Sequence, residues 1–81
     1  MKISVRLFAS LRDATGSGQL TLDAPDGATL REVVAQIVAL YPALEGQQAL
    51  WHFAVNQTHC DADTPLRAGD RVAIFPYVAG G

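Results

Sequence analysis

The sequence has little cysteine, since Cys60 is the only one among 81 residues. A single thiol cannot close an intramolecular disulfide and cannot supply the paired CxxC ligands of a structural zinc site. The adjacent His59 is not its catalytic base, because neighbouring residues of a strand point to opposite faces. We interpret Cys60 as a half-buried, unreactive thiol, and we predict no metal site.

Positive charge is neither abundant nor clustered. Six scattered basic residues against eight acidic ones leave a net charge of −2 and a pI near 5.4. Without a basic face to neutralise phosphates, the chain is not expected to bind nucleic acid. The first residues alternate instead of forming the apolar segment of a signal peptide, and no apolar run approaches the roughly 18 residues of a membrane span. We therefore expect a cytoplasmic protein that does not enter a membrane.

A catalytic constellation is also missing from the sequence. There is no nucleophilic triad, no phosphate-binding loop and no cluster of metal ligands. His52 and His59 have no carboxylate or further histidine at ligand spacing, so we assign them surface or packing roles. Trp51 is interpreted as an anchor at the margin of the core. Whether the chain counts as an enzyme stays open, because any chemistry requires a partner protein.

The N-terminal third has the pattern of two strands. Ile3, Val5, Leu7 and Ala9 alternate with polar residues, which indicates a half-buried strand, and Phe8 interrupts the polar face with a large ring. A turn or short helical piece is expected at 11–15, and a second strand at 19–23. The connector is short enough for the two strands to pair antiparallel.

A helix is the best-defined element of the sequence. Thr29 and Glu32 have the spacing of a capping box, in which each side chain accepts from a backbone N–H at the helix start. Pro42 disfavours helical geometry at the preceding residue, so the helix should end at Leu40 or Tyr41. One apolar stripe of the helix faces a core; it consists of Leu30, Val33, Val34, Ile37 and Val38.

The remaining pattern predicts three more strands, at 50–55, 58–60 and 71–75, with a loop at 43–50 and a tight turn at 56–57. The element order is β-β-α-β-β-β, for which the economical arrangement is one mixed sheet with the helix across one face. Phe8 and Phe75 then lie on the faces directed away from the core. If the first and last strands are neighbours, the two rings form an exposed apolar patch of the kind that marks partner sites; a loop covering one or both rings is the alternative.

The C-terminal residues do not serve the fold in an obvious way. Pro76 halts a strand-like run, and Gly80 and Gly81 add no packing energy, which fits either a frayed terminus or a functional end. The α-carboxylate of Gly81 is the one plausible reactive group, since it is ionised at neutral pH. Attack on ATP would give a mixed anhydride, from which a sulfur donor displaces AMP to leave a thiocarboxylate. The chain has no nucleotide site, so this chemistry needs another protein.

Nearly the whole chain resembles the ubiquitin-like sulfur carriers, and most of all the small subunit of molybdopterin synthase. The resemblance rests on the order and spacing of several fragments, each of modest specificity by itself: residues 5–12, 29–30, 54–57, 64–66, 69–70, 72–76 and 80–81. It implies an α+β, β-grasp fold, with four to five strands in a mixed sheet and one main helix packed across one face. Residues 1–81 would form one sulfur-carrier domain, of which 76–81 is an extended, flexible tail.

The resemblance also implies a mechanism and partners. Gly81 would be adenylated by a ubiquitin-activating-enzyme-like adenylyltransferase that uses ATP, then converted to a thiocarboxylate, with Gly80 giving access to the partner's channel. The carrier would bind no cofactor itself and would donate sulfur to a cyclic pterin precursor within the large synthase subunit, in a heterotetramer. The implied partner-binding residues are Phe8, Arg12, His59, Phe75, Pro76, Tyr77, Val78 and Ala79.

Some residues depart from the family pattern. Tyr77 stands where a second proline is frequent, Ala79 where a small hydroxyl residue is usual, and His59 where an apolar residue is frequent. These departures leave two alternatives open, namely a sulfur carrier for thiamin thiazole synthesis and a ubiquitin-like protein modifier. The thiamin carrier is typically shorter and lacks the middle segment 41–51 that this chain has.

Overall fold

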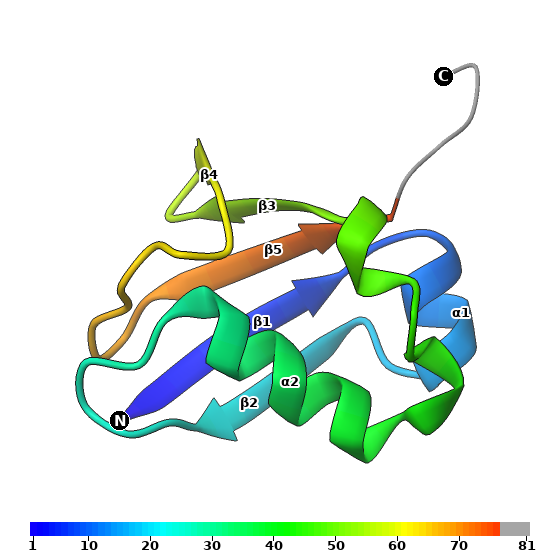
Figure 1. The fold of residues 1–81 in the computed structure, drawn as a ribbon, viewed down its shortest axis with the longest axis horizontal. Helices are drawn as coiled ribbons and strands as arrows, with labels where there is room; N and C mark the ends of the chain where they lie inside the picture. Colours follow the sequence, from blue (N-terminus) through cyan, green and yellow to red (C-terminus); the bar gives the residue numbers. More distant parts are fainter. Residues whose placement is uncertain (77–81) are drawn as a thin grey trace.

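The computed structural model describes residues 1–76, and within them five strands form one mixed sheet (Figure 1). Helix α2 (Leu30–Leu40) lies across one face of this sheet. The expected tail at 76–81 therefore falls, except for Pro76, outside the described residues. The other elements are β1 (Lys2–Leu7), α1 (Ser10–Thr15), β2 (Gln19–Asp23), the 3₁₀ turns η1 (Pro42–Leu44) and η2 (Gln48–Leu50), β3 (His52–Val55), β4 (Thr58–Cys60) and β5 (Arg71–Phe75).

The strand order β2-β1-β5-β3-β4 places the first and last strands side by side at the centre of the sheet. β1 pairs with β5 in parallel, whereas β1–β2, β3–β5 and β3–β4 pair antiparallel. A parallel pair needs a long crossover connection, and the segment between β1 and β5 includes α2, which packs on the sheet. The predicted fold class, a mixed sheet of four to five strands with one main helix, is confirmed.

The core lies between α2 and the face of the sheet that it covers. Ile3 and Val5 of β1 are fully buried, and Val5 is directly beside Val72 of β5. All five residues of the predicted helix stripe are buried, which confirms the 3.6-residue periodicity. Trp51 is buried at the margin, as predicted, and Cys60 is half-buried against the same core.

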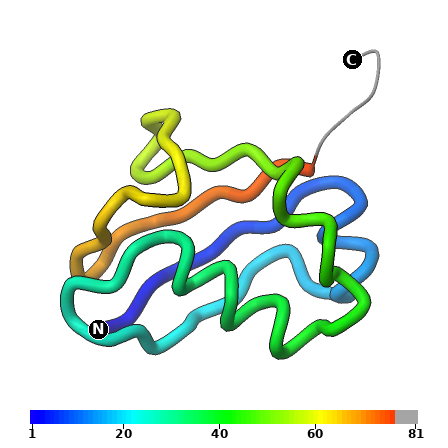
Figure 2. The backbone as a smooth tube through the Cα atoms, viewed as in Figure 1, coloured from blue at the N-terminus to red at the C-terminus, as the bar shows by residue number. Residues whose placement is uncertain are grey.

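The predicted capping box is wrong. Thr29 precedes α2 with extended backbone geometry, but its side chain makes no capping hydrogen bond. Instead, the first helical N–H groups donate to carbonyls of the loop between β4 and β5: Leu30 N–H to Thr64 at 2.9 Å and Arg31 N–H to Ala62 at 2.8 Å. Figure 2 shows this loop passing beside the chain that leads into α2. The helix start is therefore satisfied by distant backbone, which local sequence does not reveal.

The prediction that Ala9 continues the buried face of β1 is also wrong. β1 ends at Leu7, and Ala9 is exposed with φ = 51°, an uncommon value for a residue with a Cβ atom. The chain reverses here and enters α1, which confirms the expected short helical piece. In the predicted loop at 43–50 the structure has the two 3₁₀ turns, and Leu50 belongs to η2 instead of β3.

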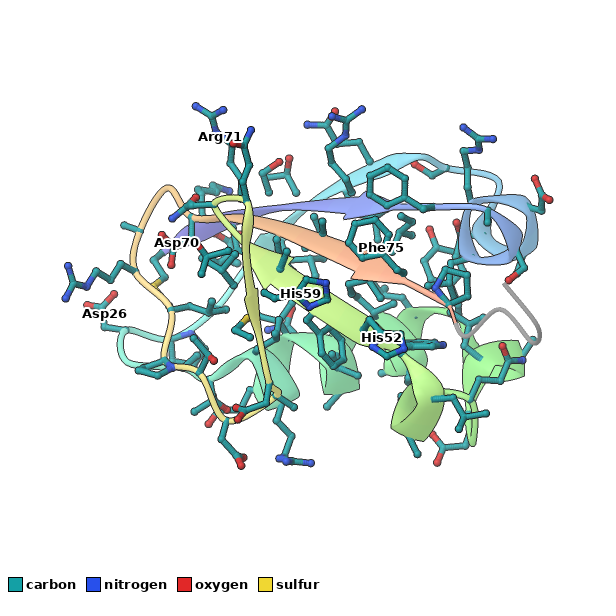
Figure 3. The ribbon with its side chains drawn as sticks, turned by 90° about the horizontal axis from the view of Figure 1, so that it is seen from above. Asp26, His52, His59, Asp70, Arg71 and Phe75 are labelled. Atoms are coloured by element: carbon teal, nitrogen blue, oxygen red, sulfur yellow. The ribbon has the colours of Figure 1, made fainter. Side chains whose placement is uncertain are left out.

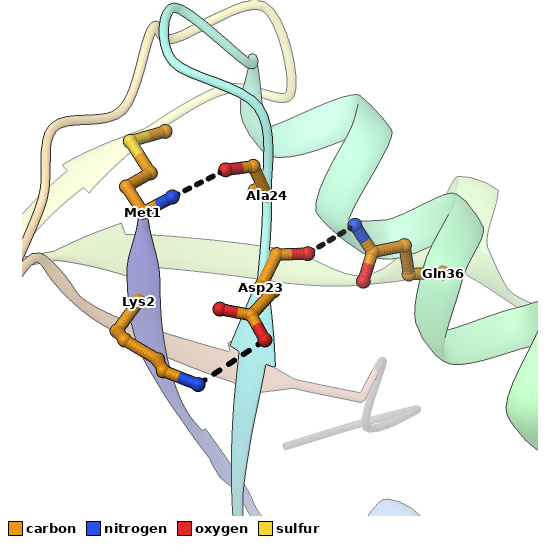
Figure 4. A network of polar contacts seen from close by, with 5 residues as sticks. All are labelled: Met1, Lys2, Asp23, Ala24 and Gln36. Carbon is orange, nitrogen blue, oxygen red and sulfur yellow. Dashed lines mark hydrogen bonds and ion pairs between the residues drawn. The ribbon is translucent and has the colours of Figure 1, made fainter.

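A small polar network joins the start of β1 to the end of β2 and to α2 (Figure 4). The Met1 amine donates to the Ala24 carbonyl at 2.7 Å, and Lys2 Nζ lies 3.1 Å from an Asp23 carboxylate oxygen. Gln36 Nε2 donates to the Asp23 carbonyl at 2.9 Å. The exposed ion pair adds little to stability, while the Gln36 contact ties the helix to the edge strand. Among the helices in residues 1–76, none has the length and apolar character needed to cross a membrane.

Replacing Ile37 by alanine should destabilise the fold by about 2–5 kcal/mol, because its side chain is 0% exposed and its loss leaves a cavity. Leu40→Ala is the matched control on the same helix: Leu40 is 59% exposed, so the expected cost is within about 0.5 kcal/mol. Urea unfolding followed by circular dichroism measures both. Equal costs for the two variants would show that α2 does not pack as described.

Candidate functional site

Two phenylalanine rings stack on the face of the sheet that α2 leaves uncovered. The centroids of Phe8 and Phe75 are 4.7 Å apart, with 15° between the ring planes. Both side chains are half-buried. The first and last strands are neighbours and the two rings meet, as the conditional prediction expected, but the rings are half-buried and not fully exposed.

The register of β1 and β5 explains why the rings meet. Leu7 and Ile74 are direct neighbours across the parallel pair, and both point into the core. The next residue of each strand therefore points to the other side, which puts Phe8 beside Phe75. Pro76 follows at once and has no N–H with which to continue the ladder.

Two arginines flank the ring pair. Arg6 Cζ lies 5.7 Å from the centroid of the Phe8 ring, within the range of a cation–π contact. Arg12, which α1 carries, lines a small recess together with Phe8 and Gly18. A Cβ added at Gly18 would lie 3.2 Å from Arg12 Cδ, so the glycine leaves space for the arginine stem.

A shallow groove extends from the ring pair across β5 and β3. Ala73 and Ala54, which are paired in the ladder, line it together with Arg6, His59 and Arg71. Figure 3 shows Phe75, His52 and His59 close together, with Arg71 near the start of β5. The groove encloses about 720 Å³, and its lining is cationic as well as apolar.

The β3–β4 turn places His59 on this face. Asn56 and Gln57 have φ values of 51° and 71°, as a two-residue type I′ hairpin turn requires, and this confirms the predicted tight turn. The hairpin register sets His59 opposite Ala54. Asn56 also receives the Arg71 N–H at its side-chain oxygen and donates to an Asp70 carboxylate, both at 3.0 Å. These bonds hold the turn against the start of β5.

The structure brings together three of the predicted partner-binding residues, Phe8, Phe75 and His59, around one groove, with Pro76 next to Phe75 and Arg12 in the adjoining recess. This places the residues; it does not test their predicted roles. The remaining predicted site residues, Tyr77, Val78, Ala79, Gly80 and Gly81, lie outside the described residues.

Several residues of this face were not predicted as part of a site. The sequence did contain a signal for them, namely the alternation that separates the two faces of each strand. Arg6 alternates with Val5 and Leu7, and Arg71 and Ala73 alternate with Val72 and Ile74. His52 and His59 lie edge to face with centroids 6.4 Å apart, although no sequence spacing paired them. Within residues 1–76 there is no group of three or more His, Cys, Asp or Glu that could hold a metal ion.

Comparison with known proteins places the chain in a family. The model of the ThiS family matches residues 5–81. The molybdopterin synthase sulfur carrier subunit of Chlamydomonas reinhardtii is 37% identical over 83 residues, with the whole of both chains covered.

Solved structures share the fold over the full chain. SAMP1 of Haloferax volcanii superimposes with a TM-score of 0.88 and 27% identity, covering 100% of both chains. A chain in the protein–protein complex of subunits 1 and 2 of the molybdopterin-converting factor from Helicobacter pylori 26695 superimposes with a TM-score of 0.70 and 27% identity, again with both chains fully covered.

A double-mutant cycle tests the stacking of Phe8 on Phe75. The variants Phe8→Ala, Phe75→Ala and the double variant should show a coupling free energy of about 0.5–1.5 kcal/mol, because each single change already removes the ring contact. Urea unfolding of the four proteins gives this value. Additive costs would mean that the rings do not interact in solution.

Proposed function

The chain belongs to the ThiS family, and on that premise we propose that it is the sulfur carrier subunit of a molybdopterin synthase. The observation that carries this proposal is the similarity to such a subunit over the full length of both chains. The paired rings at the end of β5 support it, since they give a partner an apolar surface to bind.

The proposed chemistry takes place at the carboxylate of Gly81. A carboxylate oxygen attacks the α-phosphorus of ATP in an activating adenylyltransferase, and pyrophosphate leaves. A sulfur nucleophile at the oxidation level of sulfide then attacks the acyl carbon and AMP leaves, so that one oxygen of the carboxylate is replaced by sulfur. The sulfur of the resulting thiocarboxylate forms a bond to the cyclic pterin precursor, toward the dithiolene of molybdopterin, and water then cleaves the acyl–sulfur bond, so that the sulfur stays on the precursor and the carboxylate returns.

The proposed docking surface for the large synthase subunit is the face that carries Phe8 and Phe75. Subunits 1 and 2 of the related Helicobacter pylori factor form a complex, which supports a partner of this kind; a heterotetramer is the assembly we propose. Residue 77 follows Pro76, which is adjacent to Phe75. Five residues span at most about 18 Å when extended, so the active site of the partner must lie within that distance of the docked surface.

Intact-mass measurement tests the sulfur chemistry. Incubation with the activating adenylyltransferase, ATP and a sulfur donor should convert the chain to a form in which sulfur replaces one oxygen, and tandem mass spectrometry should locate the change at Gly81. A variant lacking Gly81 should stay unmodified, because the terminal carboxylate would then belong to Gly80 and the chain would be one residue too short to bring it to the same place in the partner.

Two controls make this result unambiguous. Oxidation of Met1 or Cys60 adds one oxygen, which raises the mass by nearly the same amount as the exchange of oxygen for sulfur. Only a C-terminal thiocarboxylate, however, reverts to the original mass when it transfers its sulfur. Omitting ATP should abolish the modification. Sulfur transfer that survives deletion of Gly81 would contradict the proposal.

A second candidate function is covalent protein modification. It is favoured by the similarity to a small archaeal modifier protein, seen both in sequence and in structure. This function predicts conjugates between Gly81 and lysines of target proteins, visible as higher-mass bands that require Gly81. Such bands together with no detectable thiocarboxylate would favour modification, and thiocarboxylate without bands would favour the sulfur carrier.

A further inference from the structure

The groove on the uncovered face has a floor of small side chains and a rim of larger ones. Ala73 of β5 and Ala54 of β3 are direct ladder partners. On either side of this pair, the same row of the sheet holds Arg6, which is next to Ala73, and His59, which is next to Ala54. Neighbouring strands lie about 4.8 Å apart, so the two alanines open a gap that is wide enough for one side chain from outside.

The other two sides of this basin differ in character. Phe75 and Phe8 form an apolar wall toward the ends of β5 and β1, and Arg71 lies at the opposite side, at the start of β5. Asn56 also borders the basin, but its amide group is already bonded to Asp70 and to the Arg71 N–H. The polar side chains around the floor without a hydrogen-bond partner in residues 1–76 are therefore those of Arg6, Arg71, His59 and Gln57.

No acidic side chain lines the basin in the described part of the chain. The ion pairs found within residues 1–76 are Lys2–Asp23 and Arg31–Asp63, so neither Arg6 nor Arg71 has a carboxylate partner there. Asp70 lies near Arg71 in sequence, but its two oxygens accept from Asn56 and from the Arg67 N–H. Arg6 and Arg71 thus line a basin with one apolar side, in a protein whose net charge is −2.

We propose that this basin binds an aspartate or glutamate side chain of the large synthase subunit, held by Arg6 and Arg71 over the floor of Ala54 and Ala73. The inference rests on the proposed function and adds to it a charged specificity element beside the apolar one. A carboxylate fits because guanidinium groups donate hydrogen bonds in a planar fork that matches its two oxygens. A partner protein is the favoured source because the basin is continuous with the Phe8–Phe75 surface.

Charge complementarity of this kind selects partners and accelerates association. Phe8 and Phe75 provide apolar area that the apolar surfaces of many proteins could contact. A carboxylate that binds both arginines, in contrast, has to lie at one defined position on the partner. Partners that lack it leave two arginines partly desolvated without compensation, which weakens the wrong complex.

Binding to the large subunit, measured by titration calorimetry, separates the charged element from the apolar one. Arg6→Gln and Arg71→Gln should each weaken binding at least about tenfold and flatten its dependence on salt. Lys2→Gln is the matched control, because it removes the same charge from the same face but outside the basin. Its effect should stay below about twofold. Phe75→Ala should weaken binding by removing the apolar contact.

A cross-linking experiment identifies the occupant. Arg6→Lys keeps the charge and introduces an amine, which a carbodiimide joins directly to a carboxylate in contact with it. Mass spectrometry of the cross-linked complex should show Lys at position 6 linked to an aspartate or glutamate of the large subunit, and wild type should lack this link.

The outcomes distinguish the inference from the function on which it rests. If wild type and Arg6→Lys bind the large subunit but no such link forms, or if Lys2→Gln weakens binding as much as Arg6→Gln, the carboxylate site is wrong and the proposed function stands. If wild type does not bind the large subunit, both proposals fail. Circular dichroism should show the Arg6, Arg71 and Lys2 variants folded, since these three side chains are exposed.

Discussion

The parallel pairing of β1 with β5 is the interaction on which the rest of the structure depends. It joins the first and last strands and fixes Leu7 beside Ile74. This register produces a buried row, in which Val5 is the ladder partner of Val72. It also produces an uncovered row, in which Phe8 stacks on Phe75. A shift by one residue would exchange the faces of a strand, so the core and the candidate site cannot vary independently.

The crossover that makes this pairing possible is itself held by long-range contacts. α2 begins where the carbonyls of Ala62 and Thr64 receive its first N–H groups, and Thr29 forms an isolated bridge with Pro65. The same loop leads from β4 to β5. The start of α2, this loop and the position of β5 are therefore coupled. Because Phe75 is the last residue of β5, the same contacts help to fix the position of its ring on the uncovered face.

The sequence predicted the elements whose evidence is local. The bounds of β2 and β5 follow from alternation between turn residues, and the extent of α2 follows from its apolar stripe and from Pro42. The errors arose where the partner is distant: the helix cap, which uses loop carbonyls, and Ala9, where the chain leaves the sheet. Of the site, the ring pair was predictable once β1 and β5 were neighbours. The basin was not, because only the register brings Arg6, Ala73, Ala54 and His59 into one row.

In the proposed carrier, binding to the partner and the reaction with sulfur depend on different parts of the chain. Glycine offers no side chain to bury and alanine only a methyl group, so Ala79, Gly80 and Gly81 can contribute little binding free energy, whereas the exposed parts of the Phe8 and Phe75 rings offer apolar area. The affinity for a partner must then come mainly from residues before Ala79, among them those of the sheet, where strand geometry fixes the rings before binding and limits the entropy lost on association. In the proposed mechanism the last residues enter the active site of the partner, which then has little side-chain volume to accommodate because these residues are small.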